Sequence, residues 1–369
     1  MNARERFIRM LEGKEVDRVP FTPRMDIWYG FHKNRHSLPE PYKNQTLEEL
    51  VKELRVDASV RDGLVYRTVL DNIIIDEVKS EGTLEKYYIT PIGTVTEKFI
   101  LKPDDERAGI RALRSEHFIK STKDYNIVKF IISNTRYIPA YDDYLEYEKR
   151  TGESGYPLCK IGDVPMNLIL RDYIGYNNAY YELYDHLDLV EDLNHTMCLK
   201  FREMQDIVLD SPARLFLHGA HFDSNMTPPP IFDKYIAPYY TDFIQKLNNK
   251  NKWIASHQDA DASLLLESYK KAGIHVADCF CCYPMVPCKL EDALKSWGNS
   301  IVIWGAIPSI ILCPECFSDE EFERYLDNLF KLRGRGRIIP AISDNVMPES
   351  DISRISRIVD RLDNIYGKN

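Results

Sequence analysis

The chain has 369 residues, of which 44% are hydrophobic and 28% charged, a composition typical of a globular protein rather than a disordered or fibrous one. Lys and Arg number 48 against 57 Asp and Glu, and the resulting net charge of -9 argues against nucleic acid as a partner. The apolar stretches are shorter than the ~20 residues of a membrane helix and the first ten residues lack the apolar segment of a signal peptide, so we expect a cytoplasmic protein with no membrane partner.

Secondary structure is expected in a simple order along the chain. Residues 2–13 predict a helix capped by Asn2, and residues 18–27 predict a strand despite their prolines. Residues 71–101 contain turn signals at Glu81-Gly82 and at residues 91–93, which predict a β-hairpin insertion. From residue 155 onward, short apolar runs alternate with amphipathic ones. The runs expected as strands are 157–161, 214–218, 252–256, 275–280, 301–304 and 337–342, and the helical patterns are 261–271, 318–332 and 351–366.

Alternation of strands and helices over this length predicts a parallel α/β sheet. We expect a closed (β/α)8 TIM-type barrel with an N-terminal β insertion, forming one domain over residues 1–369. An open doubly wound sheet is the alternative, but its nucleotide-binding versions lose support because the chain has no G-x-G-x-x-G motif and no Walker loop.

Polar and sulfur-bearing side chains follow several of the expected strands. Because the C-terminal ends of barrel strands converge on one rim, these residues are candidates for a common site. They are His218, His221 and Asp223; His257, Asp259 and Asp261; Cys279, Cys281 and Cys282; Trp304; and Ser343, Asp344 and Asn345. Histidine, carboxylate and thiol together form a ligand set that suits zinc.

Several of these residues also have a structural interpretation. Asp261 can cap the helix that follows it, and Cys279 is expected to be a small buried hydrophobic residue rather than a ligand. Cys313 and Cys316 have the spacing of half a zinc site, but no second pair lies nearby. All eight cysteines are expected to be thiols, because their density is low and the chain shows no export signal.

Several short motifs, in their order and spacing, resemble the uroporphyrinogen decarboxylase superfamily over nearly the whole chain. These are residues 4–7 (RERF) with 13–20 (GKEVDRVP), 90–96 (TPIGTVT), 227–229 (TPP), 257–259 (HQD), 304–305 (WG) and 343–345 (SDN). The resemblance implies a (β/α)8 barrel, and residues 90–96 are similar to the branch that includes corrinoid-dependent methyltransferases. True decarboxylases carry an arginine-rich stretch after the first strand, of which only Arg24 is present here, so uroporphyrinogen is not the expected substrate.

The methyltransferase branch implies a zinc site built from a His-x-Cys pair and a later cysteine. Here His257 matches the histidine, while Asp259 stands in place of the first cysteine and Ser343-Asp344 in place of the second. We therefore expect a metal site, with zinc as the expected ion, on His257, Asp259 and Asp344. A more oxygen-rich ligand set suits activation of an alcohol, water or methoxy oxygen better than activation of a soft thiol.

The resulting prediction is an enzyme that moves a methyl group between a small methylated compound and a corrinoid carried by a partner protein. The expected catalytic residues are His257, Asp259, Asp223 and His221, and the expected substrate-binding residues are Arg24, Asp26, Cys281, Trp304 and Asn345. Three alternatives stay open. One is a metal-free decarboxylase or lyase acting on a smaller acid, with His257 and Asp259 as an acid–base pair. Another is a metal site that takes its thiolates from Cys281 and Cys282, and the third is a binding barrel without catalysis.

Overall fold

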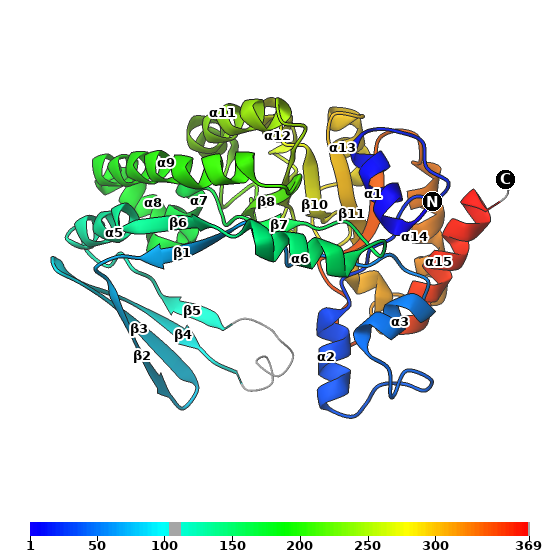
Figure 1. Cartoon of the computed structure of the whole chain (residues 1–369). Coiled ribbons are helices and arrows are strands. Elements are labelled where there is room, and N and C mark those ends of the chain that lie inside the picture. The colour runs from blue at the N-terminus through cyan, green and yellow to red at the C-terminus, as the bar shows by residue number, and fades with distance from the viewer. Residues whose placement is uncertain (103–111, 368–369) are drawn as a thin grey trace.

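A parallel six-stranded sheet forms the centre of the computed structural model, which describes residues 1–102 and 112–367 (Figure 1). The strands lie side by side in the order β12-β11-β10-β9-β8-β7. Their bounds are β7 Cys159–Lys160, β8 Leu215–Ala220, β9 Trp253–His257, β10 Val276–Phe280, β11 Val302–Pro308 and β12 Ile338–Ser343. Each overlaps a predicted apolar run, although β8, β9, β11 and β12 extend beyond theirs at the C-terminal end. Strands β10, β11 and β12 are buried throughout, as expected for a parallel sheet covered on both faces.

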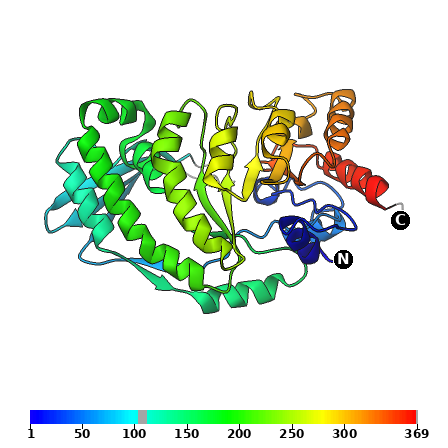
Figure 2. The same cartoon turned by 90° about the horizontal axis from the view of Figure 1, so that it is seen from above.

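Helices connect these strands and follow one another in chain order along the sheet, from green to red in Figure 2. Their bounds are α7 Pro165–Leu168, η1 Ile169–Ile174, α8 Tyr176–Asp185, α9 Leu187–Asp210, α10 Pro229–Ile231, η2 Phe232–Ile236, α11 Ala237–Asn248, α12 Leu266–Ala272, α13 Leu290–Trp297, η3 Ser309–Leu312, α14 Asp319–Lys331 and α15 Ile352–Tyr366. In the described part of the chain, no helix has the length and apolar character needed to cross a membrane.

Two predicted helix starts illustrate how local chemistry sets the boundaries. Helix α14 begins after Ser318, the first residue of its predicted range, and the Ser318 side chain forms a capping box with Glu321. Helix α12 begins at Leu266, five residues later than predicted. The reason is that the Asp261 carboxylate accepts hydrogen bonds from Ser263 and from the backbone of Cys288, so it holds a turn and does not cap a helix.

The prediction of a strand at residues 18–27 is wrong. Helix α1 (Ala3–Leu11) is capped by Asn2 as expected, but no strand is assigned between it and helix α2 (Asp26–Asn34). Proline lacks a backbone N–H, and this segment has prolines at 20 and 23, which breaks a regular ladder. It still contacts the sheet, since the N–H of Thr22 donates to Pro340 O of β12 at 3.4 Å.

A second segment, residues 56–63, continues from that contact toward the other edge of the sheet. The N–H of Asp57 donates to Phe21 O at 2.8 Å, and the N–H of Leu158 donates to Val60 O at 2.9 Å. Neither segment is a strand, so the assigned architecture is a six-stranded parallel α/β sheet rather than a closed eight-stranded barrel.

The predicted β insertion is present as an antiparallel sheet below the parallel one in Figure 1. It contains β2 Ile74–Ser80, β3 Thr83–Thr90 and β4 Gly93–Ile100, and it is larger than predicted because β5 Leu113–Glu116 adds a fourth strand. An ion pair between Arg114 of β5 and Asp172 of η1, at 2.6 Å, joins the insertion to the rest of the chain. The remaining elements are α3 Leu47–Glu53, β1 Tyr66–Leu70, α5 Asp124–Ser133, β6 Thr135–Pro139 and α6 Tyr141–Thr151.

Candidate metal centre

His257 is the last residue of β9 and only 8% of its surface is exposed. Its Nδ1 lies 2.9 Å from Oδ2 of Asp278, a fully buried residue of β10. Arg61 donates to both oxygens of that carboxylate and, at 7% exposure, is itself buried. Burial by itself would raise the pKa of Asp278, but the Arg61 guanidinium outweighs it and holds the pKa far below its usual range. An ionised Asp278 accepts the Nδ1 proton, which leaves Nε2 of His257 to face the site.

Nε2 of His257 lies near two further carboxylates. It is 3.6 Å from Oδ2 of Asp259 and 3.4 Å from Oδ1 of Asp344, which directly follows β12. Arg24 donates to Oδ1 of Asp344, and Asn345 donates to its Oδ2 at 2.6 Å. With zinc–ligand bonds of about 2.0–2.1 Å, two ligands of a tetrahedral ion are about 3.3–3.4 Å apart, so each of these spacings suits two ligands of one ion.

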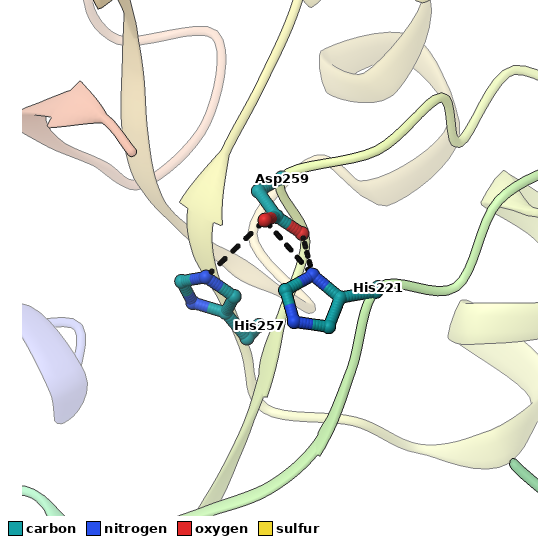
Figure 3. A group of neighbouring side chains, drawn as sticks. All are labelled: His221, His257 and Asp259. Carbon is teal, nitrogen blue, oxygen red and sulfur yellow. Dashed lines mark hydrogen bonds and ion pairs between the residues drawn. The ribbon is translucent and has the colours of Figure 1, made fainter. Parts of the chain in front are cut away.

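Asp259 also binds the second histidine of the rim, His221 (Figure 3). Nδ1 of His221 lies 2.7 and 2.9 Å from the two oxygens of Asp259, and both imidazole rings point at this carboxylate. The His221 side chain is 49% exposed, and its backbone N–H donates to His257 O at 3.0 Å. Burial would raise the pKa of Asp259, but the hydrogen bonds from His221 and His257 lower it, so Asp259 is ionised.

The charge state of His257 follows from these neighbours. Burial would lower its pKa, whereas Cys279, Asp259 and Asp278 together raise the pKa well above its usual value. These acidic neighbours favour the protonated form of His257 in the protein without a metal ion. A divalent cation would replace that proton with a larger positive charge, since a coordinating histidine must be neutral.

Two groups of side chains could hold an ion, and both include His257. One is His221, His257 and Asp259, and the other is His257, Cys279 and Asp344; within each group the ligand atoms lie within 4.8 Å of one another. The predicted ligands His257, Asp259 and Asp344 are thus divided between the two groups. Nitrogen, sulfur and carboxylate donors fit zinc, whereas magnesium and calcium prefer oxygen alone.

Two predicted substrate-binding residues, Arg24 and Asn345, lie at this centre through their contacts with Asp344. Asp26 is an exposed residue at the start of α2. Trp304 is buried in the core, where its Nε1 donates to Thr22 Oγ1 at 2.7 Å and Arg61 lies over its ring at 4.4 Å. Trp304 therefore packs against the Arg61 guanidinium in the core and does not line an open surface.

Asp223 and Cys281 lie near the rim in structural roles. Asp223 accepts hydrogen bonds from the backbone N–H groups of Asn225, Met226 and Asp261, which fixes the loop after β8. Cys281 is buried, and burial raises the pKa of its thiol to about 12. All eight cysteines are free thiols, as predicted, and Cys313 and Cys316 lie outside both ligand groups, just before α14.

Sequence reasoning missed Arg61 and Asp278 and assigned Cys279 to the core. Asp278 did carry a signal, because it is a charged residue in the middle of the apolar run 274–280, and a buried charge requires a partner. Arg61 carried none, since it lies 217 residues away in a segment without regular structure.

A comparison of the chain with models of known protein families found no match, and a search of curated proteins found none either.

Proposed function

We propose that this protein is an enzyme that moves a methyl group between a small methylated compound and a corrinoid on a partner protein, with zinc held by His257. One observation carries the metal centre. Nε2 of His257 faces two carboxylates, while Nδ1 is anchored by the buried Asp278–Arg61 pair. The choice of methyl transfer among metal-assisted reactions rests on the resemblance to the uroporphyrinogen decarboxylase superfamily.

Each residue around His257 has a distinct part in this proposal. Asp278 fixes the ring orientation and keeps the proton on Nδ1, and Arg61 keeps Asp278 ionised. Arg24 holds Asp344 and adds a positive charge next to the place where the substrate would bind. Zinc bound here would act as a Lewis acid on the oxygen or sulfur of the methylated compound.

In either direction the methyl group moves as CH3+. When the methylated compound gives up its methyl group, its oxygen or sulfur loses the bond to carbon and keeps the electron pair of that bond. In the opposite direction the oxygen or sulfur supplies the electron pair of the new bond. The corrinoid of the partner protein would supply the electron pair of its own bond to carbon when it accepts the methyl group and would keep that pair when it gives the methyl group up. A proton enters or leaves the oxygen or sulfur to balance its charge. No external oxidant or reductant is needed, because the electron pair is exchanged only between the methylated compound and the corrinoid.

The two extended segments also support a proposal about the fold. Residues 19–24 bond to β12 through Thr22, and residues 56–63 bond to residues 154–158 and form a parallel bridge between Gly63 and Cys159 of β7. We infer that these segments stand in the places of the first two strands of a TIM-type barrel. Arg24 and Arg61 would then lie at the C-terminal ends of the first two barrel strands, as His257 and Asp344 lie at or after the ends of β9 and β12.

A second candidate function is a metal-free lyase that acts on a small acid. The raised pKa of His257 favours it, because an imidazolium at neutral pH can donate a proton to a carbanion formed by loss of CO2. Asp259→Asn tests this version, since it removes the carboxylate that accepts from both histidines.

Metal content and methyl transfer from a methylated corrinoid, measured on protein purified without chelator, test the first proposal. We expect about one zinc per chain and turnover that His257→Ala abolishes. His195→Ala, which changes an exposed histidine of α9, serves as the matched control and should keep both properties. Methyl transfer that persists in His257→Ala, in protein with an unchanged circular dichroism spectrum, would exclude the role of His257, and wild-type protein without methyl transfer would exclude this function.

A further inference from the structure

Cys279 lies at an irregularity of β10. The pairing between β10 and β11 shifts register between Asp278 and Phe280, and Cys279 has φ 52, in the left-handed region. Left-handed backbone is strained for a residue with a Cβ, and bulges of this kind re-aim side chains next to functional sites. In a regular strand, Asp278 and Cys279 would point to opposite faces, yet here both contact Arg61.

The redirected sulfur lies among charged groups of the centre. Sγ of Cys279 is 3.6 Å from Nη2 of Arg61 and 3.9 Å from Nη1 of Arg24, and both nitrogens donate to it. It is also 3.9 Å from the backbone oxygen of Asp344. Burial and the Asp278 carboxylate raise the pKa of this thiol, and Arg61 opposes the rise. The contacts therefore place the sulfur beside His257 and Asp344, and a metal ion bound here would displace the thiol proton, because cysteine ligates as the thiolate.

We propose that the zinc ion occupies the group formed by His257, Cys279 and Asp344, with Cys279 as a thiolate ligand. This inference rests on the proposed function in one respect only, that His257 holds a metal ion. It makes the centre a mixed nitrogen, sulfur and oxygen site, so zinc and cobalt should bind and magnesium should not.

The competing group fits less well. Both oxygens of Asp259 already accept hydrogen bonds from Nδ1 of His221, and the His221 side chain is half exposed. Cys279 is 1% exposed, and Asp344 is fixed by Arg24 and Asn345. Side chains already held by packing and hydrogen bonds lose less conformational entropy on binding an ion than a half-exposed histidine does.

Cobalt(II) titration of the whole chain tests the assignment without any measurement of activity. Cobalt bound to a thiolate absorbs in the near ultraviolet by charge transfer, and we expect this band in the wild-type protein. Cys279→Ser should remove the band and weaken cobalt binding by more than the roughly 10–100-fold that loss of an outer partner costs. Cys281→Ser, a change at a buried thiol two residues away and outside both ligand groups, should keep band and affinity.

Cys279→Gly separates ligand loss from misfolding. Glycine tolerates a left-handed backbone, so this variant should unfold at no lower urea concentration than Cys279→Ser and should also lack the band. Three results would overturn the assignment. One is wild-type protein that binds no cobalt, and another is a band that persists in Cys279→Gly. The third is a wild-type spectrum that lacks the band while cobalt affinity depends on His221. Methyl transfer is a separate readout, so its absence would reject the proposed function and leave the cobalt result standing.

Discussion

Replacing Asp278 by Asn removes one charge from the buried pair that anchors His257. Asp278 is fully buried and Arg61 is 7% exposed, so the variant leaves the Arg61 guanidinium in the interior without a carboxylate. Breaking such a pair costs about 3–5 kcal/mol of the free energy of unfolding. At 1.36 kcal/mol per tenfold, the unfolding equilibrium constant should rise by roughly 150- to 5000-fold.

The same change should also weaken zinc binding. An asparagine amide can donate to Nδ1 of His257, which moves the ring proton to Nε2 and removes the lone pair that faces the site. Loss of an outer carboxylate partner typically lowers metal affinity by about 10–100-fold. Urea unfolding of the metal-free protein and competition with a chromophoric zinc chelator measure the two effects separately.

A surface pair of the same chemistry provides the control. Arg136 donates to both oxygens of Asp71, but the two side chains are 57% and 37% exposed, so water solvates whichever charge remains. Asp71→Asn should therefore shift the urea midpoint far less than Asp278→Asn. Equal shifts in the two variants, or zinc affinity unchanged in Asp278→Asn, would refute the argument from burial and from ring orientation. Adding Arg61→Met to Asp278→Asn should recover part of the lost stability, because no unpaired charge then stays buried.

Three further predictions follow from individual groups. Because the pKa of His257 is raised well above its usual value, protons compete for this ligand beyond pH 6.5, and zinc affinity should still rise between pH 6.5 and 8; a plateau above pH 6.5 in the chelator competition would contradict this. Burial lowers the pKa of both His218 and His275 to about 4. The unfolded chain binds protons there below about pH 6.5 and the folded protein does not, so the free energy of unfolding should fall between pH 6.5 and 4 by at most about 3 kcal/mol per histidine; urea titrations that show no decrease would count against it. Gly305→Ala should destabilise the protein by about 1–3 kcal/mol or more, because its Cβ would lie 2.5 Å from the backbone nitrogen of Phe280 at φ +147, whereas Gly30→Ala in α2 meets open space and should be neutral or stabilising in the same thermal melt.

The sequence alone determined the elements whose signals are local. The six apolar runs after residue 155 contain or overlap the six strands β7 to β12, Asn2 caps α1 as expected, and α14 begins after Ser318, where its predicted range begins. Strand ends also indicated much of the centre, because convergence of parallel strands is a property of the fold class; His257, Asp259 and Asp344 were found in this way.

Only the tertiary structure decided which of these groups meet. Arg61 reaches Asp278 across 217 residues, and no local pattern records that contact. Cys279 was expected in the core because cysteine is often a small buried hydrophobic residue. It is buried, but a bulge with a left-handed residue turns its sulfur toward Arg61 and Arg24. Periodicity and capping depend on neighbours in the chain, whereas pairing of buried charges and local breaks in register depend on packing between distant segments. The two candidate ligand groups therefore depend on contacts between distant segments of the folded chain.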